Sequence, residues 1–162
     1  MRHLNHHADR GLTLIELMVS LAIAAILTMA AAPSFKDYLA NSRLRENGNV
    51  IYMQMLFAQS EAIKRNTTVR VTVDDGEVEV TDRNDPDNPV VLKTANLTHG
   101  VAAEEATLDF SGEGRPVDFA TVSIDLSPPT GLSCSTEIRC PGLRVDGGGA
   151  IRLCSDHTTN CD

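Results

Sequence analysis

One carboxylate lies inside the most apolar segment of the chain. Glu16 is the only charged residue between Leu12 and Ala32. A helix of these 21 residues is about as long as the hydrocarbon core of a bilayer is thick. Because a carboxylate in a membrane-spanning helix costs roughly 2.5–3.5 kcal/mol, Glu16 needs a partner. The chemistry expected here is charge pairing with a cation from a neighbouring helix in a low-dielectric setting.

A glycine precedes this apolar run, and basic residues precede the glycine. Gly11 follows Arg10 directly, and Arg2 lies nearer the N-terminus. A secretory signal peptide places its apolar run before a small-residue cleavage site, whereas here the small residue comes first. The order therefore favours a spanning helix whose basic end stays in the cytoplasm. We expect the domain that follows the span to lie outside the cytoplasm.

The segment from Arg10 to Glu16, with the apolar run behind it, resembles the leader and N-terminal helix of type IV pilins and type II secretion pseudopilins. The resemblance implies that residues 1–11 form a leader, which a prepilin peptidase removes after Gly11. It implies that Leu12 becomes the N-methylated first residue, where these proteins usually have Phe. It also implies that Glu16 pairs with the N-terminal amine of a neighbouring subunit during assembly.

All four cysteines lie in the last 29 residues of the chain. An even number of cysteines outside the cytoplasm favours two disulfides. Local pairs would close small loops and crossed pairs would fasten the tail to the preceding loop, and the spacing leaves all three pairings open. A zinc site that also uses His157 is disfavoured, because no Cys-x-x-Cys pair is present. The cysteines are Cys134, Cys140, Cys154 and Cys161.

The other polar clusters do not predict a catalytic or metal site. Residues 81–89, TDRNDPDNP, hold three aspartates but lack the glycine and terminal glutamate of an EF-hand loop, so we interpret them as a solvated acidic turn. Three of the five histidines lie in the expected leader, and neither His99 nor His157 accompanies a nucleophile motif. The sequence therefore predicts a protein that is not an enzyme, with no cofactor, metal or small-molecule substrate.

Apolar residues continue at helical spacing beyond the apolar run. We expect one helix from Leu12 to Arg65, with residues 12–32 in the inner membrane and residues 33–66 in the periplasm. Gly48 is the expected soft point of this helix. One face should be apolar, beside a narrow polar stripe. The apolar face comprises Ile51, Met55, Ala58 and Ala62, and the stripe comprises Gln54, Glu61 and Arg65.

After Asn66 the apolar residues occur at every second position instead of at helical spacing. Valines alternate with polar residues from Val69 to Val73 and from Val78 to Val80, and Asp74-Asp75-Gly76 lies between them as a turn, which predicts a β-hairpin. A helix followed by strands indicates an α+β fold: a long N-terminal helix packed on an antiparallel β-rich head of residues 67–162. Further strands are expected at Val90–Lys93, Ala106–Phe110, Ala120–Leu126, Leu143–Val145 and Ala150–Cys154.

Two further segments narrow the family resemblance. Phe57–Asn66 with the valine-rich strand behind it, and Gly149–Cys154 near the C-terminus, resemble the GspH/FimT family of minor pilins and pseudopilins. The resemblance implies a pilin fold and a non-enzymatic minor subunit that helps to initiate a type IV pilus at or near its tip. Its partners would be other minor and major pilins. A GspH-type minor pseudopilin of type II secretion is an alternative, although the paired cysteines favour the pilus.

A DNA receptor at the pilus tip is the other alternative, because some FimT-like proteins contact DNA through a Gly-Arg-x-Arg motif. Gly149 and Arg152 match this motif here, but Ala150 replaces the first arginine. The leader holds two arginines and one aspartate, so its removal changes the net charge from −8 to −9. A DNA interface needs several basic residues on one face. We therefore rank DNA binding second, with Arg144 and Arg152 as the expected contacts.

Overall fold

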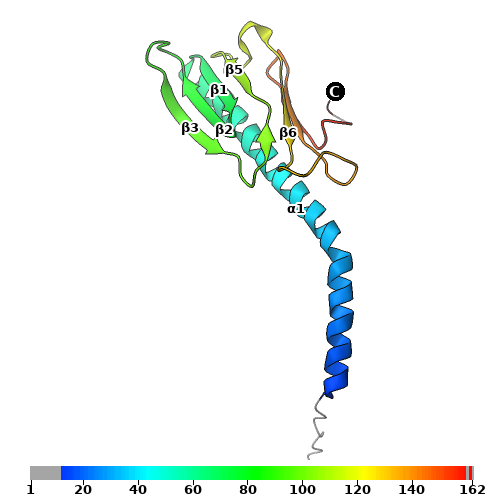
Figure 1. Cartoon of the computed structure of the whole chain (residues 1–162). Coiled ribbons are helices and arrows are strands. Elements are labelled where there is room, and N and C mark those ends of the chain that lie inside the picture. Colours follow the sequence, from blue (N-terminus) through cyan, green and yellow to red (C-terminus); the bar gives the residue numbers. More distant parts are fainter. Residues whose placement is uncertain (1–11, 160, 162) are drawn as a thin grey trace, which may run out of the picture. The chain divides into compact units, whose positions relative to one another are not determined.

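The computed structural model describes residues 12–159 and residue 161. Gly11 and the leader histidines lie outside these residues. The described chain forms one long helix, α1 (Leu14–Arg65), followed by β-strands and one short 3-10 helix, η1 (Val117–Phe119) (Figure 1). It divides into an N-terminal unit that ends at Lys36 and a head of residues 37–162. The two units are described separately.

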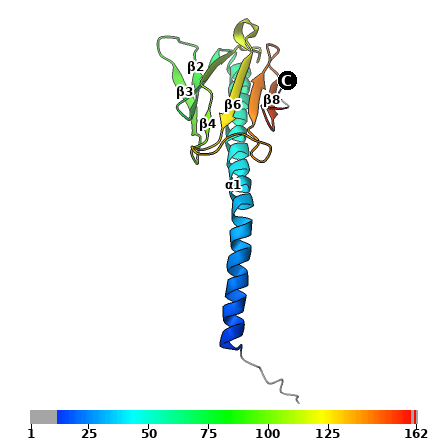
Figure 2. The same cartoon turned by 45° about the vertical axis from the view of Figure 1, so that its right-hand side comes forward.

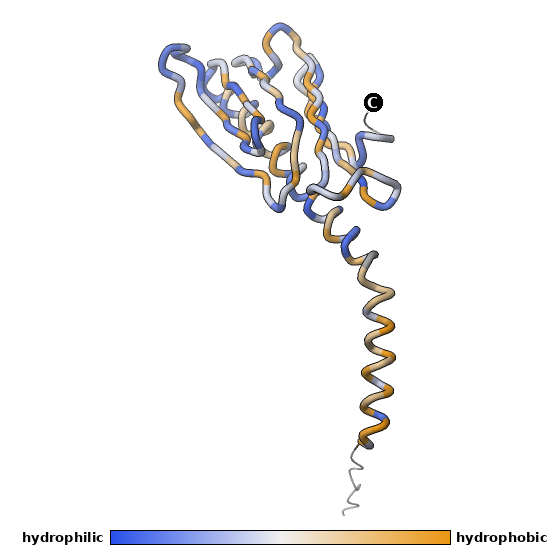
Figure 3. The backbone as a smooth tube through the Cα atoms, viewed as in Figure 1, coloured by the Kyte–Doolittle hydropathy of each residue, from blue (hydrophilic) through white to orange (hydrophobic). Residues whose placement is uncertain are grey.

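The N-terminal unit consists of the first part of α1. Leu14–Ala32 is a 19-residue segment with a mean hydropathy of 2.3, which is long and apolar enough to cross a membrane. Figure 3 shows this part of the helix mostly in the colour of apolar residues. Every residue of the segment is exposed to solvent in the isolated chain. Its apolar surface therefore requires lipid or neighbouring helices around it.

The first sheet of the head contains the expected hairpin. Its strands are antiparallel in the order β3-β2-β1-β5. Asp75 and Gly76 link the first two strands with φ values of 44° and 76°, as a tight two-residue hairpin turn requires. The prediction of a β-hairpin is confirmed. The strands are β1 (Val69–Asp74), β2 (Glu77–Asp82), β3 (Val90–Asn96) and β5 (Ala106–Phe110).

The second sheet is also antiparallel, in the order β4-β6-β7-β8. Three of its strands match expected segments within two residues at each end. The first of these begins at Val122 rather than Ala120, because η1 and its C-cap occupy the preceding residues. The two-residue β4 was not predicted. The strands are β4 (Ala102–Ala103), β6 (Val122–Ser127), β7 (Gly142–Val145) and β8 (Ile151–Cys154).

The head part of α1 forms one hydrophobic core with both sheets. Figure 2 shows β2 and β3 on one side of this helix and β8 on the other. Alternate residues of the strands point inward, as the period of two requires. The fold is therefore α+β, as predicted. The core includes Leu44, Ile51, Met55, Ala58 and Ala62 of α1, Val69, Val71, Val73, Val78, Val80, Leu108 and Phe110 of the first sheet, and Ile124, Leu126, Leu143 and Val145 of the second.

The helix continues through Gly48, which is buried, and a Cβ there would lie 3.4 Å from both Pro141 and Leu153. One expectation about α1 is wrong. Gln54 and Glu61 do not form an exposed polar stripe, because they are only 2% and 8% exposed. The helix contacts two sheets, so its buried arc is wider than its apolar face. Neither amide atom of Gln54 has a hydrogen-bond partner among the described residues.

Three amide side chains on α1 hold the backbone of head loops. Asn41 donates to the carbonyl of Glu137 (2.7 Å) and accepts from the N–H of Arg139 (2.8 Å). Asn47 donates to the carbonyl of Thr98 (3.2 Å) and accepts from its N–H (2.7 Å). A third amide, that of Gln59, donates to the carbonyls of Gly114 (2.6 Å) and Gly149 (2.8 Å). The helix thus fixes loops as well as strands.

Candidate functional site

The N-terminus of α1 brings the predicted assembly residue into a reciprocal cap. Thr13 precedes the first helical residue, and Glu16 is the third residue of the helix. The Glu16 carboxylate accepts from the Thr13 N–H (2.9 Å) and hydroxyl (2.8 Å), both through Oε2. The Glu16 N–H donates in return to the Thr13 hydroxyl oxygen (3.3 Å). This is a capping box, which satisfies N–H groups that the helix itself leaves unpaired.

The cap leaves the carboxylate able to accept a further charge. Oε1 of Glu16 makes no hydrogen bond to a described residue. Leu12, the expected mature N-terminus, lies directly before Thr13 and is 79% exposed. The geometry therefore places a carboxylate with one free oxygen about one helical turn from the expected mature N-terminus. The Thr-x-x-Glu spacing is the signal in the sequence that identifies Thr13 as the cap residue.

Hydroxyl groups farther along this segment bond to the helix itself. The Ser20 hydroxyl donates to the carbonyl of Glu16 (2.7 Å). The Thr28 hydroxyl lies within hydrogen-bond distance of the carbonyls of Ala24 (3.0 Å) and Ala25 (2.9 Å). Such internal bonds remove polar groups from the helix surface. Glu16 is then the only charge that the segment offers to a neighbouring helix.

The cysteines of the head adopt the local pairing. Cys134 is joined to Cys140 and Cys154 to Cys161. The described residues contain no group of three His, Cys, Asp or Glu side chains that could hold a metal ion.

The tail after β8 folds over the second sheet at Gly142. The His157 N–H donates to the carbonyl of Cys140 (2.7 Å). A Cβ at Gly142 would lie 2.8 Å from the Cys161 Sγ and from the His157 Cβ, closer than such contacts allow. Glycine is therefore required at position 142 for the tail to pack here. The tail disulfide and the His157 hydrogen bond hold it in place.

The two candidate DNA contacts lie side by side on adjacent strands. Arg144 of β7 pairs in register with Arg152 of β8, so both side chains lie on one face of the sheet. The Arg144 Nη1 lies 2.6 Å from the Asp125 Oδ1 and also donates to the carbonyl of Leu143 (3.1 Å). Arg152 is exposed and forms no ion pair with a described residue. Asp125 therefore neutralises half of this small basic cluster.

The acidic turn between β2 and β3 uses its carboxylates to stabilise its own backbone. Asp82 accepts from the N–H of Asn84 (2.8 Å), and Asp85 accepts from the N–H of Asp87 (3.1 Å). Hydrogen bonds from the Asn88 side chain and then the Asp87 N–H lower the pKa of Asp85. These are local turn contacts, which agrees with the interpretation of a solvated acidic turn.

Two family descriptions match the sequence. The prokaryotic N-terminal methylation motif matches residues 6–32, and type II transport protein GspH matches residues 47–160. The second match covers more than half of the chain, including most of the head. Among curated proteins, the fimbrial protein EcpC of Eikenella corrodens is 46% identical over 42 residues, which are 26% of this chain and 28% of EcpC. The matched segment thus spans little more than a quarter of that relative.

Solved structures with the same fold include two minor subunits. The type IV minor pilin FimU of Pseudomonas aeruginosa is 14% identical with a TM-score of 0.59, over 72% of this chain and 91% of FimU. The minor pseudopilin EpsH from the type II secretion system of Vibrio cholerae is 13% identical with a TM-score of 0.56, over 75% of this chain and 99% of EpsH. At these identities the likeness concerns the fold, which is that of pilins.

Proposed function

Because the chain belongs to the GspH family of type II transport proteins, we propose that it is a minor pilin, a non-enzymatic subunit that helps to initiate a type IV pilus and lies at or near its tip. The observation that carries the proposal is the first part of α1. Its apolar segment is fully exposed and bears one carboxylate at its N-terminus. A helix of this kind is stable in lipid before assembly and among other such helices after it.

Processing of the precursor follows from the same proposal. A prepilin peptidase removes residues 1–11 after Gly11, and Leu12 is N-methylated. Residues 12–32 then hold the protein in the inner membrane, with residues 33–66 of the helical segment and the head of residues 67–162 in the periplasm. On assembly, Glu16 pairs with the amine of a neighbouring major or minor pilin, so the membrane-spanning helix exchanges lipid for protein neighbours.

A role in type II secretion is the alternative within the same fold. The family description and the likeness to EpsH support it, whereas the likeness to FimU and the match to a fimbrial protein support the pilus. The two C-terminal disulfides also favour the pilus.

Deletion of the gene, with complementation, tests the proposal. We expect the amount of pili sheared from the cell surface to fall severalfold, with secretion of folded exoproteins unchanged. The wild-type gene should restore the pili. Loss of secretion with normal pili would assign the protein to the secretion system instead.

DNA binding is a second candidate, which the register of Arg144 opposite Arg152 favours. The Asp125 ion pair and the acidic net charge oppose it. We therefore expect the full-length protein to bind duplex DNA weakly at about 150 mM salt, and steeply less as salt rises. Tight binding in a fluorescence polarisation assay, abolished by Arg152→Ala, would make DNA uptake the leading function. Ala150→Arg would restore the arginine missing from the motif and should increase any binding.

A further inference from the structure

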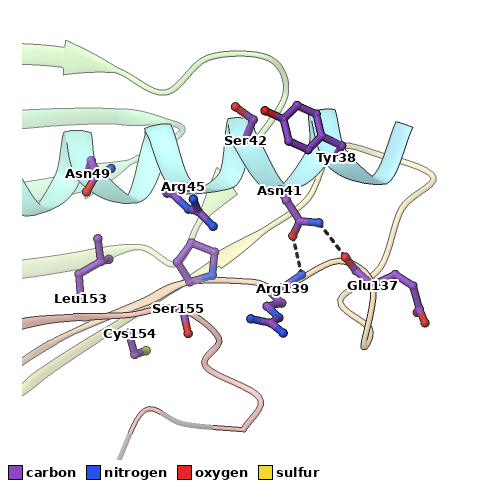
Figure 4. A pocket seen from close by; sticks show the side chains of 11 residues that line it. Tyr38, Asn41, Ser42, Arg45, Asn49, Glu137, Arg139, Leu153, Cys154 and Ser155 are labelled. Atoms are coloured by element: carbon purple, nitrogen blue, oxygen red, sulfur yellow. Dashed lines mark hydrogen bonds between the residues drawn. The ribbon is translucent and has the colours of Figure 1, made fainter. Parts of the chain in front are cut away.

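A groove of about 560 Å³ lies beside α1 near the start of the head. Its first wall is a stripe of exposed α1 residues spaced by four, three and four positions (Figure 4). Its second wall is the loop that the Cys134–Cys140 disulfide closes, together with the end of β8 and Ser155. No role described above uses this groove. The stripe comprises Tyr38, Ser42, Arg45 and Asn49.

The loop that carries one wall is held rigidly. The Asn41 side chain bonds to the Glu137 carbonyl and to the Arg139 N–H. Ile138, between these two residues, is buried in the core, and the disulfide closes the loop on either side. The backbone of Arg139 is therefore preorganised, which lowers the entropy cost of binding through its side chain.

The floor of the groove is apolar and lies beside Gly48 of α1. Pro141 and Leu153 line it. A Cβ at position 48 would lie 3.4 Å from each of them, so the loop and β8 approach the helix closely here. The groove thus combines an apolar floor with polar walls, as peptide and ligand sites do.

The walls carry two cations without a counter-ion. Arg45 and Arg139 form no ion pair with any described residue, although the chain has a net charge of −8. Both residues line the groove, and Figure 4 shows the Glu137 carboxylate pointing away from Arg139 and Arg45. That carboxylate instead accepts from the Ser135 hydroxyl (3.2 Å) in its own loop. Two unpaired guanidinium groups that line one groove attract an anion to it.

We propose that this groove binds a carboxylate-bearing, acidic segment of a neighbouring pilin subunit. Guanidinium groups bind carboxylates through two parallel hydrogen bonds, and two of them suit a segment with more than one acidic side chain. Ser42 and Asn49 offer hydrogen bonds to the backbone of such a segment, and Pro141 and Leu153 contact its aliphatic parts. The identity of the partner as a pilin rests on the proposed function, whereas the acidic ligand follows from the groove itself.

The test uses full-length protein in nanodiscs of zwitterionic phosphatidylcholine, with fluorescent tetraglutamate as the probe and tetraglutamine as its uncharged match. We expect saturable binding of tetraglutamate that weakens as salt rises. The double variant Arg45→Gln/Arg139→Gln should bind at least 10-fold more weakly. Arg83→Gln is the matched control, because Arg83 lies in the turn after β2, outside the groove, and forms no ion pair with a described residue. Equal thermal midpoints for the variants would show that all of them fold.

Several results would overturn the proposal. These are tetraglutamate binding no stronger than that of tetraglutamine, an equal loss in Arg83→Gln, or no loss in the double variant. Nanodiscs with phosphatidylglycerol distinguish a lipid ligand: if the anionic lipid binds through Arg45 and Arg139 and tetraglutamate does not, the groove recognises lipid phosphate and the proposal is wrong. Pilus assembly is measured separately. Normal pili without tetraglutamate binding would reject the proposal that the groove binds an acidic segment, and would leave the proposed function standing. Tetraglutamate binding by a protein that is absent from pili would reject the proposed function, and would leave the binding proposal standing.

Discussion

At the residue scale, the most informative side chain is Glu16, and its hydrogen bonds explain how an acidic residue is accommodated in the apolar segment of α1. The carboxylate is bound by the Thr13 N–H and hydroxyl through one oxygen, which offsets part of its desolvation cost. The sequence predicted the importance of Glu16 from its isolation among apolar residues. It did not predict that Thr13 helps to hold it, although the spacing contained that information.

Glu16→Ala is expected to separate insertion from assembly. Removal of the carboxylate makes insertion easier but removes the group that we propose to pair with a neighbouring amine. Membrane-bound protein should stay at the wild-type amount, while the protein in sheared pili should fall at least about 10-fold, equivalent to roughly 1.4 kcal/mol. Quantitative immunoblots of both fractions measure this. Thr13→Ser, which keeps the cap hydroxyl, is the control, and normal incorporation of Glu16→Ala would remove the basis for charge pairing.

Glu61 predicts a pH dependence of head stability. Its side chain is 10% exposed and lies 2.7 Å from the Arg65 Nε and 3.1 Å from the Lys64 Nζ. The hydrogen bond from Arg65, and then that from Lys64, lowers the pKa of Glu61 in the folded protein. A lowered folded pKa stabilises the protein above the unfolded value of about 4.3, and this stability is lost as pH falls through the folded pKa.

Thermal midpoints of the wild type and Glu61→Gln test this dependence. We expect the variant to melt lower at pH 7, where the wild-type carboxylate is charged and paired. The difference should shrink near pH 3, because protonation removes the pair from the wild type. The exposed Glu46, which forms no ion pair with a described residue, supplies Glu46→Gln as a control. A Glu61→Gln difference that is the same at both pH values would contradict this role.

At the scale of elements, the sequence predicts those that a regular hydrophobic period specifies. The valines of β1 and β2 alternate, and the turn between them has Asp and Gly where positive φ is needed. By contrast, β4 has two residues, too few for any period to appear. In η1, Asp118 and Phe119 adopt φ values of 57° and 56°. Positive φ values are uncommon for residues other than glycine, so the local sequence does not indicate them.

The burial of polar residues on α1 could not be predicted from a helical wheel. Gln54 and Asn47 are polar by type, yet they are buried because α1 lies against two sheets. Asn47 satisfies the backbone of Thr98 through both amide atoms. Because Thr98 lies 51 positions from Asn47 in the chain, no local sequence pattern indicates this contact. The width of the buried arc therefore became known only from the tertiary structure.

Asn47→Ala is expected to destabilise the head. The change leaves the Thr98 N–H without its side-chain acceptor, and the loss of such a bond costs about 1–3 kcal/mol. Asn49→Ala, two positions away on the exposed face, should change the free energy of unfolding by less than about 0.5 kcal/mol. Urea denaturation of both variants measures the difference. Equal effects would show that the Thr98 contact does not contribute to stability.

At the scale of the whole molecule, the two disulfides fix the C-terminal third of the head. The sequence predicted two disulfides but not their pairing, because all three pairings fit the spacing. In the structure, Cys134 pairs with Cys140 and Cys154 pairs with Cys161. The loop that the first disulfide closes forms one wall of the groove beside α1. Intact-mass analysis should show a loss of four hydrogens relative to the reduced chain.

The two disulfides are expected to differ in their contribution. Each closes a small loop, which by loop entropy alone is worth about 2–3 kcal/mol. Cys140 is fully buried in the core, with Cys134 packed against it, whereas Cys154 and Cys161 are only half-buried. Cys134→Ser/Cys140→Ser should therefore lower the thermal midpoint more than Cys154→Ser/Cys161→Ser. The opposite order would show that the disulfide of the tail over Gly142 contributes more to thermal stability.

The central claim, that this chain is processed and built into a pilus, is tested most directly by the N-terminal peptide of the protein recovered from sheared, purified pili. Mass spectrometry of that peptide should show a chain that begins at Leu12 and carries one methyl group on its amine. Pili that lack the protein, although the cells contain it, would contradict the claim, as would a chain that retains residues 1–11 or begins at another residue.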